Sequence, residues 1–165
     1  MVKPSLSSES SSGLVVYKSH AQALLEAWWS FGQTMRQHVI PKVIGDLDLE
    51  FKDFLALVAI HDGALYPKLI CTRLATNPSD ISRILEKLEE KELVTRALDP
   101  EDSRRIRVVL TAHGLATLEH KRQAMAEHIL KAVEDMPANE LERFANTMKH
   151  LTDGIKAQFK DDANQ

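Results

Sequence analysis

The sequence predicts a mainly helical domain with one small β-hairpin, and three observations support this fold class. Apolar residues recur at the helical spacing of three and four along most of the chain. Two short runs rich in β-branched residues interrupt that pattern in one place only. A 5% aromatic share, with six glycines and six prolines, argues against a β-sandwich or a collagen-like chain. The length of 165 residues fits one domain with a sizeable core.

Composition limits the cellular compartments and the classes of partner that we expect for this chain. The single cysteine, Cys71, excludes an intramolecular disulfide framework and favours a reducing compartment. The longest apolar run, residues 54–60, is far too short to span a bilayer, and no signal peptide is expected. We therefore expect a cytoplasmic protein without a membrane partner. A net charge of −3 is not the basic balance typical of nucleic-acid-binding domains, but a local positive face can be offset elsewhere.

The N-terminal part should consist of an arm and one long helix. Residues 1–17 are rich in serine at their start and are expected to form a disordered arm. From about residue 18 to residue 40 the apolar side chains follow helical spacing, and Pro41 is expected to end this helix.

Two further helices should follow. Asp48 is a candidate N-cap for a helix over 49–61, and Gly63 lies just past its end. Because this helix is apolar on both sides, we expect it to be central. Pro67 then suits the first position of a short helix ending near Leu74.

The fourth helix has the clearest start signal in the chain. Asn77 is a good N-cap, Pro78 a good first residue, and Asp80 stands where a capping carboxylate belongs. The helix is expected to run to about Lys91. It should bury Ile81, Ile84, Leu85 and Leu88 and leave Ser79, Asp80, Ser82 and Arg83 facing outward.

A two-stranded ribbon and two long helices complete the chain. Residues 93–98 and 106–110 should form the strands, joined by the charged segment 99–105. Thr111 can cap the next helix, and Pro137 should separate it from the last one.

Two short helices joined by a tight turn and followed by a hairpin define a winged helix-turn-helix, in which the second helix enters the major groove of DNA. The start of that helix offers unpaired N–H groups and a positive dipole end to phosphates. Ser79, Ser82 and Arg83 can donate to bases or backbone. Arginines at the hairpin can enter a minor groove or neutralise phosphates: Arg104, Arg105 and Arg107.

Four short motifs in this order resemble the MarR family of bacterial transcriptional regulators: residues 77–83, 88–94, 99–104 and 110–114. The similarity spans about residues 24–159. It implies a homodimer in which each subunit presents one recognition helix and one wing to half of a pseudo-palindromic site. It also implies a repressor that leaves DNA when a small phenolic or anionic effector binds, with residues 18–45 and 112–160 as dimerisation helices around a DNA-binding lobe, 46–111.

The resemblance also suggests individual roles. Ser79, Ser82 and Arg83 match groove-facing positions, Arg104 matches the wing arginine, and Asp102 matches the acid that steadies it. The full predicted DNA-binding set is Ser79, Asp80, Ser82, Arg83, Lys87, Arg104, Arg105 and Arg107, with Asp102 supporting Arg104.

Three positions depart from the family pattern. Ala75 and Glu92 stand where glycine is usual, and because a positive φ strains a residue with a side chain, those turns are expected to differ locally from the family's. Asp80 places a carboxylate in the first turn, which suits the helix end but repels phosphate unless it accepts a hydrogen bond from a cytosine amino group.

The other candidate sites each have two interpretations. Trp28 and Trp29 suit dimer packing. Alternatively, one of them lines an effector pocket whose polar contacts come from Arg36, His38, Asp53 or His61. Cys71 suits a small buried apolar residue better than a redox centre.

No enzyme, cofactor or metal is expected. The histidines lack the i, i+4 pairing that places two ligands on one helical face, and no phosphate loop or nucleophile motif occurs. The alternative to a DNA-binding regulator is a winged-helix scaffold that binds protein and has no affinity for DNA.

Overall fold

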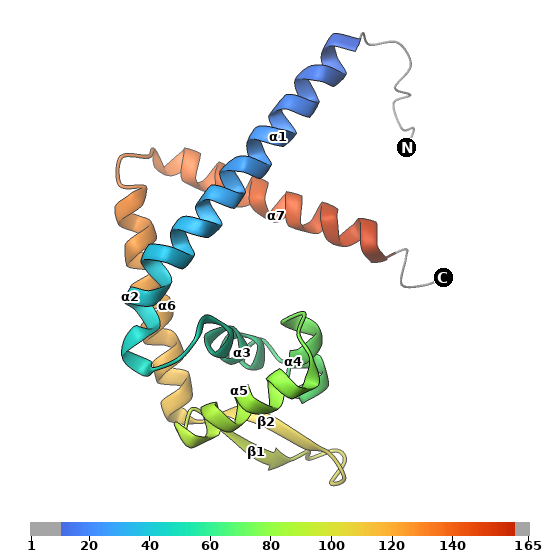
Figure 1. The fold of residues 1–165 in the computed structure, drawn as a ribbon, viewed down its shortest axis with the longest axis vertical. Helices are drawn as coiled ribbons and strands as arrows, with labels where there is room; N and C mark the ends of the chain where they lie inside the picture. Colours follow the sequence, from blue (N-terminus) through green and yellow to red (C-terminus); the bar gives the residue numbers. More distant parts are fainter. Residues whose placement is uncertain (1–10, 161–165) are drawn as a thin grey trace. The chain divides into compact units, whose positions relative to one another are not determined.

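The computed structural model describes residues 11–160 of the chain, which form two compact units (Figure 1). The first unit ends at Arg122 and the second begins at Gln123. The elements in order are α1 (Ser11–Thr34), the π-helical turn η1 (Met35–Val39), α2 (Ile40–Ile44), the 3-10 turn η2 (Gly45–Leu47), α3 (Phe51–His61), α4 (Pro67–Arg73), α5 (Pro78–Glu90), β1 (Val94–Leu98), β2 (Ile106–Leu110), α6 (Ala112–Ala132) and α7 (Ala138–Lys160). The predicted fold class, mainly helical with one hairpin, is confirmed.

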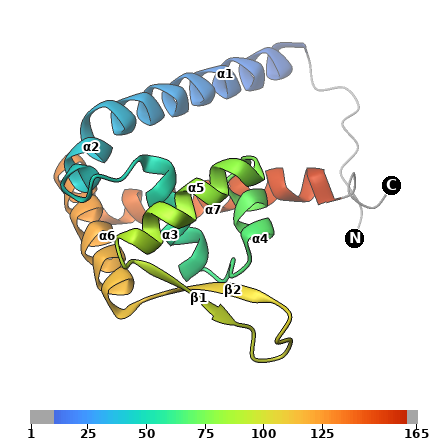
Figure 2. The ribbon, with the colours of Figure 1, turned by 60° about the horizontal axis from the view of Figure 1, so that its bottom comes forward.

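The core of the first unit lies among α3, α4, α5, the hairpin and the start of α6. Figure 2 shows the hairpin beside these helices, with its connecting loop projecting outward. As predicted, α3 is central, because it buries side chains on both sides, including Phe54 and Leu57. The large side chains with almost no exposure are Leu57, Ile70, Ile81, Leu88, Leu93, Leu118 and Val108.

The N-terminus of α3 differs from the prediction. Glu50, not Asp48, is the N-cap, and a capping box joins it to Asp53, whose carboxylate accepts the Glu50 backbone N–H at 2.8 Å. Asp48 instead adopts a left-handed conformation at φ 49° in the preceding turn. The helix ends at His61 as predicted, and Gly63 follows with φ 92°, a conformation that favours glycine.

Pro41 does not end the first helical segment, contrary to the prediction. The backbone N–H of Ile40 bonds to the Met35 carbonyl, five residues back, and this π turn widens the helix just before the proline. Pro41 therefore occupies the first turn of α2, where its missing N–H costs little. At the other end, α1 begins at Ser11, earlier than the expected residue 18, while the rest of the expected arm lies outside the described residues.

The hairpin is hydrogen-bonded to the segment before α4 and leads directly into α6. Its strands pair antiparallel from Val94 opposite Leu110 to Leu98 opposite Ile106, and Val108 N donates to the Leu65 carbonyl at 2.7 Å. Thr111 caps α6 as predicted, accepting the Gly114 N–H at 2.9 Å.

Gly114 packs its α-carbon against the end of the wing. A Cβ at this position would stand 1.8 Å from the Leu93 carbonyl oxygen, so glycine alone allows this approach.

The second unit consists of the end of α6, the turn at Pro137 and α7. Its large apolar side chains are exposed at Leu130, Phe144, Ile155 and Phe159. The same is true of α1 in the first unit, at Leu24, Leu25, Trp28, Trp29 and Phe31. Within the part of the chain described, no helix combines the length and apolar character needed to cross a bilayer.

Candidate nucleic-acid interface

The helix pair α4–α5 is joined by a short turn with a left-handed residue at its start. Ala75 has φ 47°, so the turn keeps the left-handed geometry for which glycine is usual, and the expected local difference is not found. Asn77 then caps α5, because its side-chain oxygen accepts the Asp80 N–H at 2.8 Å, and Pro78 opens the helix. At the far end of α5, Glu92 turns the chain with φ 55°.

The first turns of α5 separate a buried face from an exposed one. Ile81, Ile84, Leu85 and Leu88 are buried, as predicted. Ser79, Ser82 and Arg83 are exposed beside them. The positive dipole end of the helix lies at the same place, although Asn77 already accepts the N–H groups of Asp80 and Ile81.

Asp80 is used within the chain. Its carboxylate accepts hydrogen bonds from the Thr76 hydroxyl and the Asn77 side-chain amide, each at 3.0 Å, and Lys52 Nζ lies 4.0 Å away. These contacts hold the turn and the helix start together and offset part of the negative charge. A contact with a cytosine amino group stays a prediction.

Lys87 is also used within the chain. Its ammonium lies 3.0 Å from the carboxylate of Asp53, whose side chain is only 5% exposed. The hydrogen bond that Lys87 donates to the Asp53 carboxylate raises the pKa of Lys87 above its usual 10.5. This ion pair joins α3 to α5 and directs the charge of Lys87 toward the core of the lobe.

The three wing arginines have different environments. Arg104 is exposed, and its backbone N–H bonds to the Asp102 carboxylate at 3.1 Å, so Asp102 supports it through the main chain. Arg105 lies over the ring of Tyr66, with 4.0 Å from its guanidinium carbon to the ring centroid. Arg107 is half-buried opposite Ala97, and its Nε has no hydrogen-bond partner among the described residues.

Sequence reasoning missed the bond between Tyr66 and Asp99. The Tyr66 hydroxyl donates to the carboxylate of Asp99, a residue that is only 8% exposed. This bond raises the pKa of Tyr66 and lowers that of Asp99. The two residues are 33 positions apart, so no local pattern could have indicated the contact.

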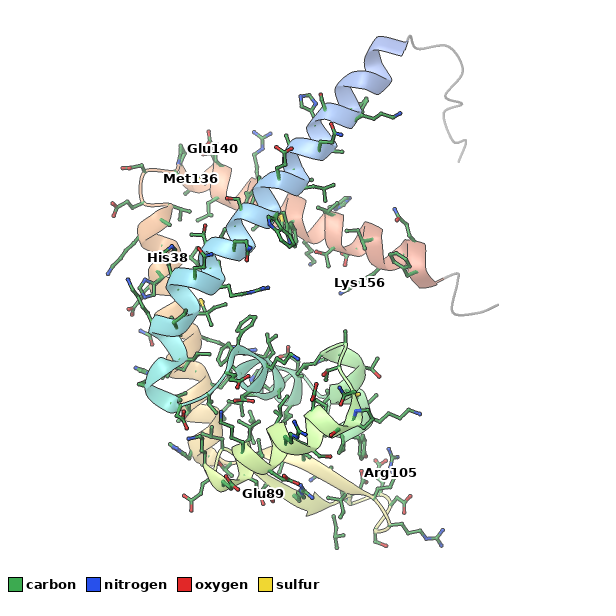
Figure 3. The ribbon with its side chains drawn as sticks, in the orientation of Figure 1. His38, Glu89, Arg105, Met136, Glu140 and Lys156 are labelled. Atoms are coloured by element: carbon green, nitrogen blue, oxygen red, sulfur yellow. The ribbon has the colours of Figure 1, made fainter. Side chains whose placement is uncertain are left out.

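The start of α5 and the wing loop share one side of the lobe. In Figures 1 and 2 the wing loop and the N-terminal end of α5 lie on one side of the lobe. Figure 3 shows Arg105 at that loop and Glu89 near the opposite end of α5.

Two of the expected effector-pocket residues, Asp53 and His61, lie near opposite ends of α3. Asp53 lies near the start of that helix against Lys87, whereas His61 ends it and contacts Asp62 and Arg122. Trp28 and Trp29 are exposed on α1, and Arg36 and His38 are exposed on η1.

Cys71 and the histidines give no sign of a reactive or metal centre. Cys71 is half-buried, and its thiol donates to the Thr76 carbonyl at 2.7 Å, inside the turn. Among residues 11–160 no group of three potential metal ligands comes together.

A capped helix pair with an exposed leading turn and an adjoining arginine-bearing hairpin defines a winged helix-turn-helix DNA-binding protein. Comparison with known proteins agrees with this class. Residues 47–105 match the family model described as MarR family. The transcriptional regulator SarZ of Staphylococcus aureus (strain MRSA252) is 29% identical over 115 residues, covering 69% of this chain and 74% of SarZ.

Solved structures show the same fold. RV1404 from Mycobacterium tuberculosis superposes with a TM-score of 0.67 at 22% identity, covering 89% of this chain and 95% of that one. CouR from Rhodococcus jostii RHA1, solved bound to p-coumaroyl-CoA, gives a TM-score of 0.61 at 20% identity, over 77% and 90% of the two chains. Residues 47–105 are thus similar to the MarR family over the helix-turn-helix and the wing, and the SarZ relatives are transcriptional regulators.

Proposed function

We propose that the protein is a cytoplasmic, homodimeric repressor that binds a pseudo-palindromic DNA site. The observation that carries this proposal is the exposed N-terminal turn of α5 beside the wing loop, both on one side of the lobe. An exposed helix start with a flanking basic hairpin suits one half-site, and a two-fold dimer supplies the second.

Within this proposal the exposed side chains make the DNA contacts. Ser79, Ser82 and Arg83 enter the major groove, and Arg104 reaches a phosphate or the minor groove. Lys87 and Arg105 act mainly inside the protein, because Asp53 and Tyr66 already engage them. Arg107 and Asp80 stand at the edge of this surface as secondary contacts.

The dimer in this proposal forms through the flanking helices. Exposed Leu24, Trp28 and Phe31 on α1, and Phe144 and Phe159 on α7, are large apolar groups that a partner subunit would remove from water. Residues 46–111 then serve as the DNA-binding lobe, and the helices before and after it as the dimerisation part.

An effector completes the regulator. CouR is solved with p-coumaroyl-CoA, a molecule that is both phenolic and anionic. By analogy we propose that a small phenolic or anionic compound releases this protein from DNA, with Trp28 or Trp29 among its contacts.

Selection of duplexes from random oligonucleotides, followed by titration at several salt concentrations, tests the proposal. We expect one enriched motif with two-fold symmetry and an affinity that falls linearly with salt on a log–log scale. Enrichment of no motif would contradict it and favour a protein-binding scaffold, the alternative that the carboxylate of Asp80 at the helix start supports.

A further inference from the structure

A chain of hydrogen bonds connects the start of α4 to the tip of the wing. The Tyr66 hydroxyl donates to one oxygen of the Asp99 carboxylate, and the other oxygen accepts the backbone N–H groups of Glu101 at 2.8 Å and Asp102 at 3.3 Å. The Asp102 carboxylate in turn accepts the Arg104 N–H at 3.1 Å. Three backbone N–H groups of the wing loop are thus held by the carboxylates of Asp99 and Asp102, and Asp99 is itself bonded to Tyr66.

The aromatic ring of Tyr66 makes a second contact with the same loop. Arg105 lies over the ring at 4.0 Å, and its backbone carbonyl accepts the Asp99 N–H at 2.9 Å. Hydroxyl and ring therefore hold the two ends of the loop, Asp99 and Arg105. The residue before Tyr66, Leu65, accepts the Val108 N–H, which fastens β2 to the same segment.

We infer that Tyr66 is a positioning residue for DNA binding, because it holds the wing loop so that Arg104 faces DNA. The guanidinium of Arg105 stacks on the tyrosine ring and does not contact DNA. This inference rests on the proposed role of Arg104 at the DNA. It also assigns different roles to two adjacent residues, Arg104 and Arg105.

The physical reason is preorganisation. A loop with this many charged side chains has several accessible conformations in water, and ordering it at the moment of binding would cost free energy. Asp99 is almost fully buried, so its carboxylate needs the Tyr66 hydroxyl and the two N–H groups as partners. Because Tyr66 also stands at the N-cap position of α4, it joins the wing to the helix pair whose second member is proposed to enter the major groove.

Tyr66→Phe tests the inference because it keeps the ring and removes only the hydroxyl. With the duplex that the wild-type protein selects, we expect affinity to fall about 3- to 10-fold, since a hydrogen bond to a charged group is lost. Tyr17→Phe is the matched control: Tyr17 is the only other tyrosine, is 78% exposed on α1, and should change affinity by less than about twofold.

The Arg104→Ala background separates positioning from a general structural effect. If Tyr66 acts through Arg104, adding Tyr66→Phe to Arg104→Ala should change affinity by less than about twofold. A full Tyr66→Phe effect in that background would overturn the inference. So would a loss of affinity on Arg105→Ala that persists in the Tyr66→Phe background, because it would make Arg105 a DNA contact.

Amide hydrogen exchange in the free protein provides a readout that does not need DNA. Tyr66→Phe should speed exchange at Glu101, Asp102 and Arg104 about 10-fold or more, and leave α7 unchanged. Unchanged exchange at those amides would overturn the inference. If the wild-type protein selects no duplex, the proposed function fails, and this measurement still decides whether Tyr66 holds the wing.

Discussion

The DNA-binding lobe and the flanking helices use their apolar side chains in opposite ways. In the lobe, Leu57, Ile81 and Leu88 have almost no exposure. On the flanking helices, Trp29 is 72% exposed and Phe159 65%. The lobe closes its core within one chain, whereas the long helices keep an apolar stripe that only another surface can cover. The two parts should therefore respond to different mutations.

The buried charges of Asp53 and Lys121 are each paired within the chain. Asp53 is paired with Lys87, and Lys121, only 6% exposed at its side chain, donates to both oxygens of Asp46 at 2.6 and 2.7 Å. The Lys121 contact lowers the pKa of Asp46. Such pairs join elements distant in sequence, so the lobe is held by specific polar contacts as well as by burial.

Leu24→Glu should have the largest effect of all, and it should act on the stability of the dimer that the flanking helices are proposed to form. Glutamate is a good helix former, so α1 should persist, but a charge buried in the proposed interface would weaken the dimer by about 4 kcal/mol. Sedimentation velocity should show a shift to monomer at micromolar concentration.

Leu98→Glu is the control for this substitution. Leu98 is 66% exposed but belongs to the wing, so its replacement should leave the dimer intact. An unperturbed dimer in Leu24→Glu would place the interface elsewhere.

Gly114→Ala should have the next largest effect, on the lobe. Its Cβ would meet the Leu93 carbonyl at 1.8 Å, so α6 or the end of the wing must shift, at a cost of about 3 kcal/mol. Denaturant unfolding measures the loss. Gly45→Ala is the control, because its Cβ would meet nothing within 4 Å; a loss as large in that variant would remove the packing explanation.

Arg104→Ala should weaken DNA binding by about 1–3 kcal/mol with little effect on folding, because the side chain is exposed and acts only at the DNA. Fluorescence anisotropy with the selected duplex measures the change. Arg143→Ala, also exposed but on α7, should bind as the wild type does. Equal affinities in both variants would remove the wing from the mechanism.

Lys87→Met should act on stability rather than on DNA affinity. The apolar stem is kept, but Asp53 loses its cationic partner and keeps the Glu50 N–H, which should cost about 1–2 kcal/mol after allowance for the partly exposed ammonium. A raised pKa means that the pair stabilises the fold fully below pH 10.5 and is lost as pH rises further. The stability difference from the wild type should therefore be constant near neutral pH and shrink above about pH 10.5.

Salt titration separates this effect from a DNA contact. If Lys87 neutralised a phosphate, the log–log salt slope would fall by about one in Lys87→Met. We expect no change in slope.

Local signals in the sequence predicted the helix-turn-helix and the wing accurately. Asn77 and Pro78 start α5 because a cap acts over three residues, and Thr111 starts α6 for the same reason. Where two local signals competed, the prediction was wrong: Asp48 looked like a cap, but Glu50 and Asp53 form a reciprocal pair two residues later. Pro41 looked like a stop, but a π turn accommodates it.

Contacts between residues far apart in the sequence could not be predicted from local sequence patterns. The sequence places Lys87 among the predicted DNA contacts, but its contact with Asp53 depends on how α3 packs against α5. The bond between Tyr66 and Asp99 depends in the same way on how the hairpin lies against the helices. The exposed positions Ser79, Ser82 and Arg83 were predictable because helical periodicity alone separates them from the buried face.

Ala75→Gly should have the smallest effect and the opposite sign. At φ 47° an alanine side chain is strained, and glycine relieves that strain while adding freedom to the unfolded chain, so we expect a net gain of about 0.5 kcal/mol. Ala116→Gly, the same change within α6, should instead cost about 1 kcal/mol. Denaturant unfolding of both variants measures the difference; a loss in Ala75→Gly as large as in Ala116→Gly would mean that the turn between α4 and α5 carries no strain.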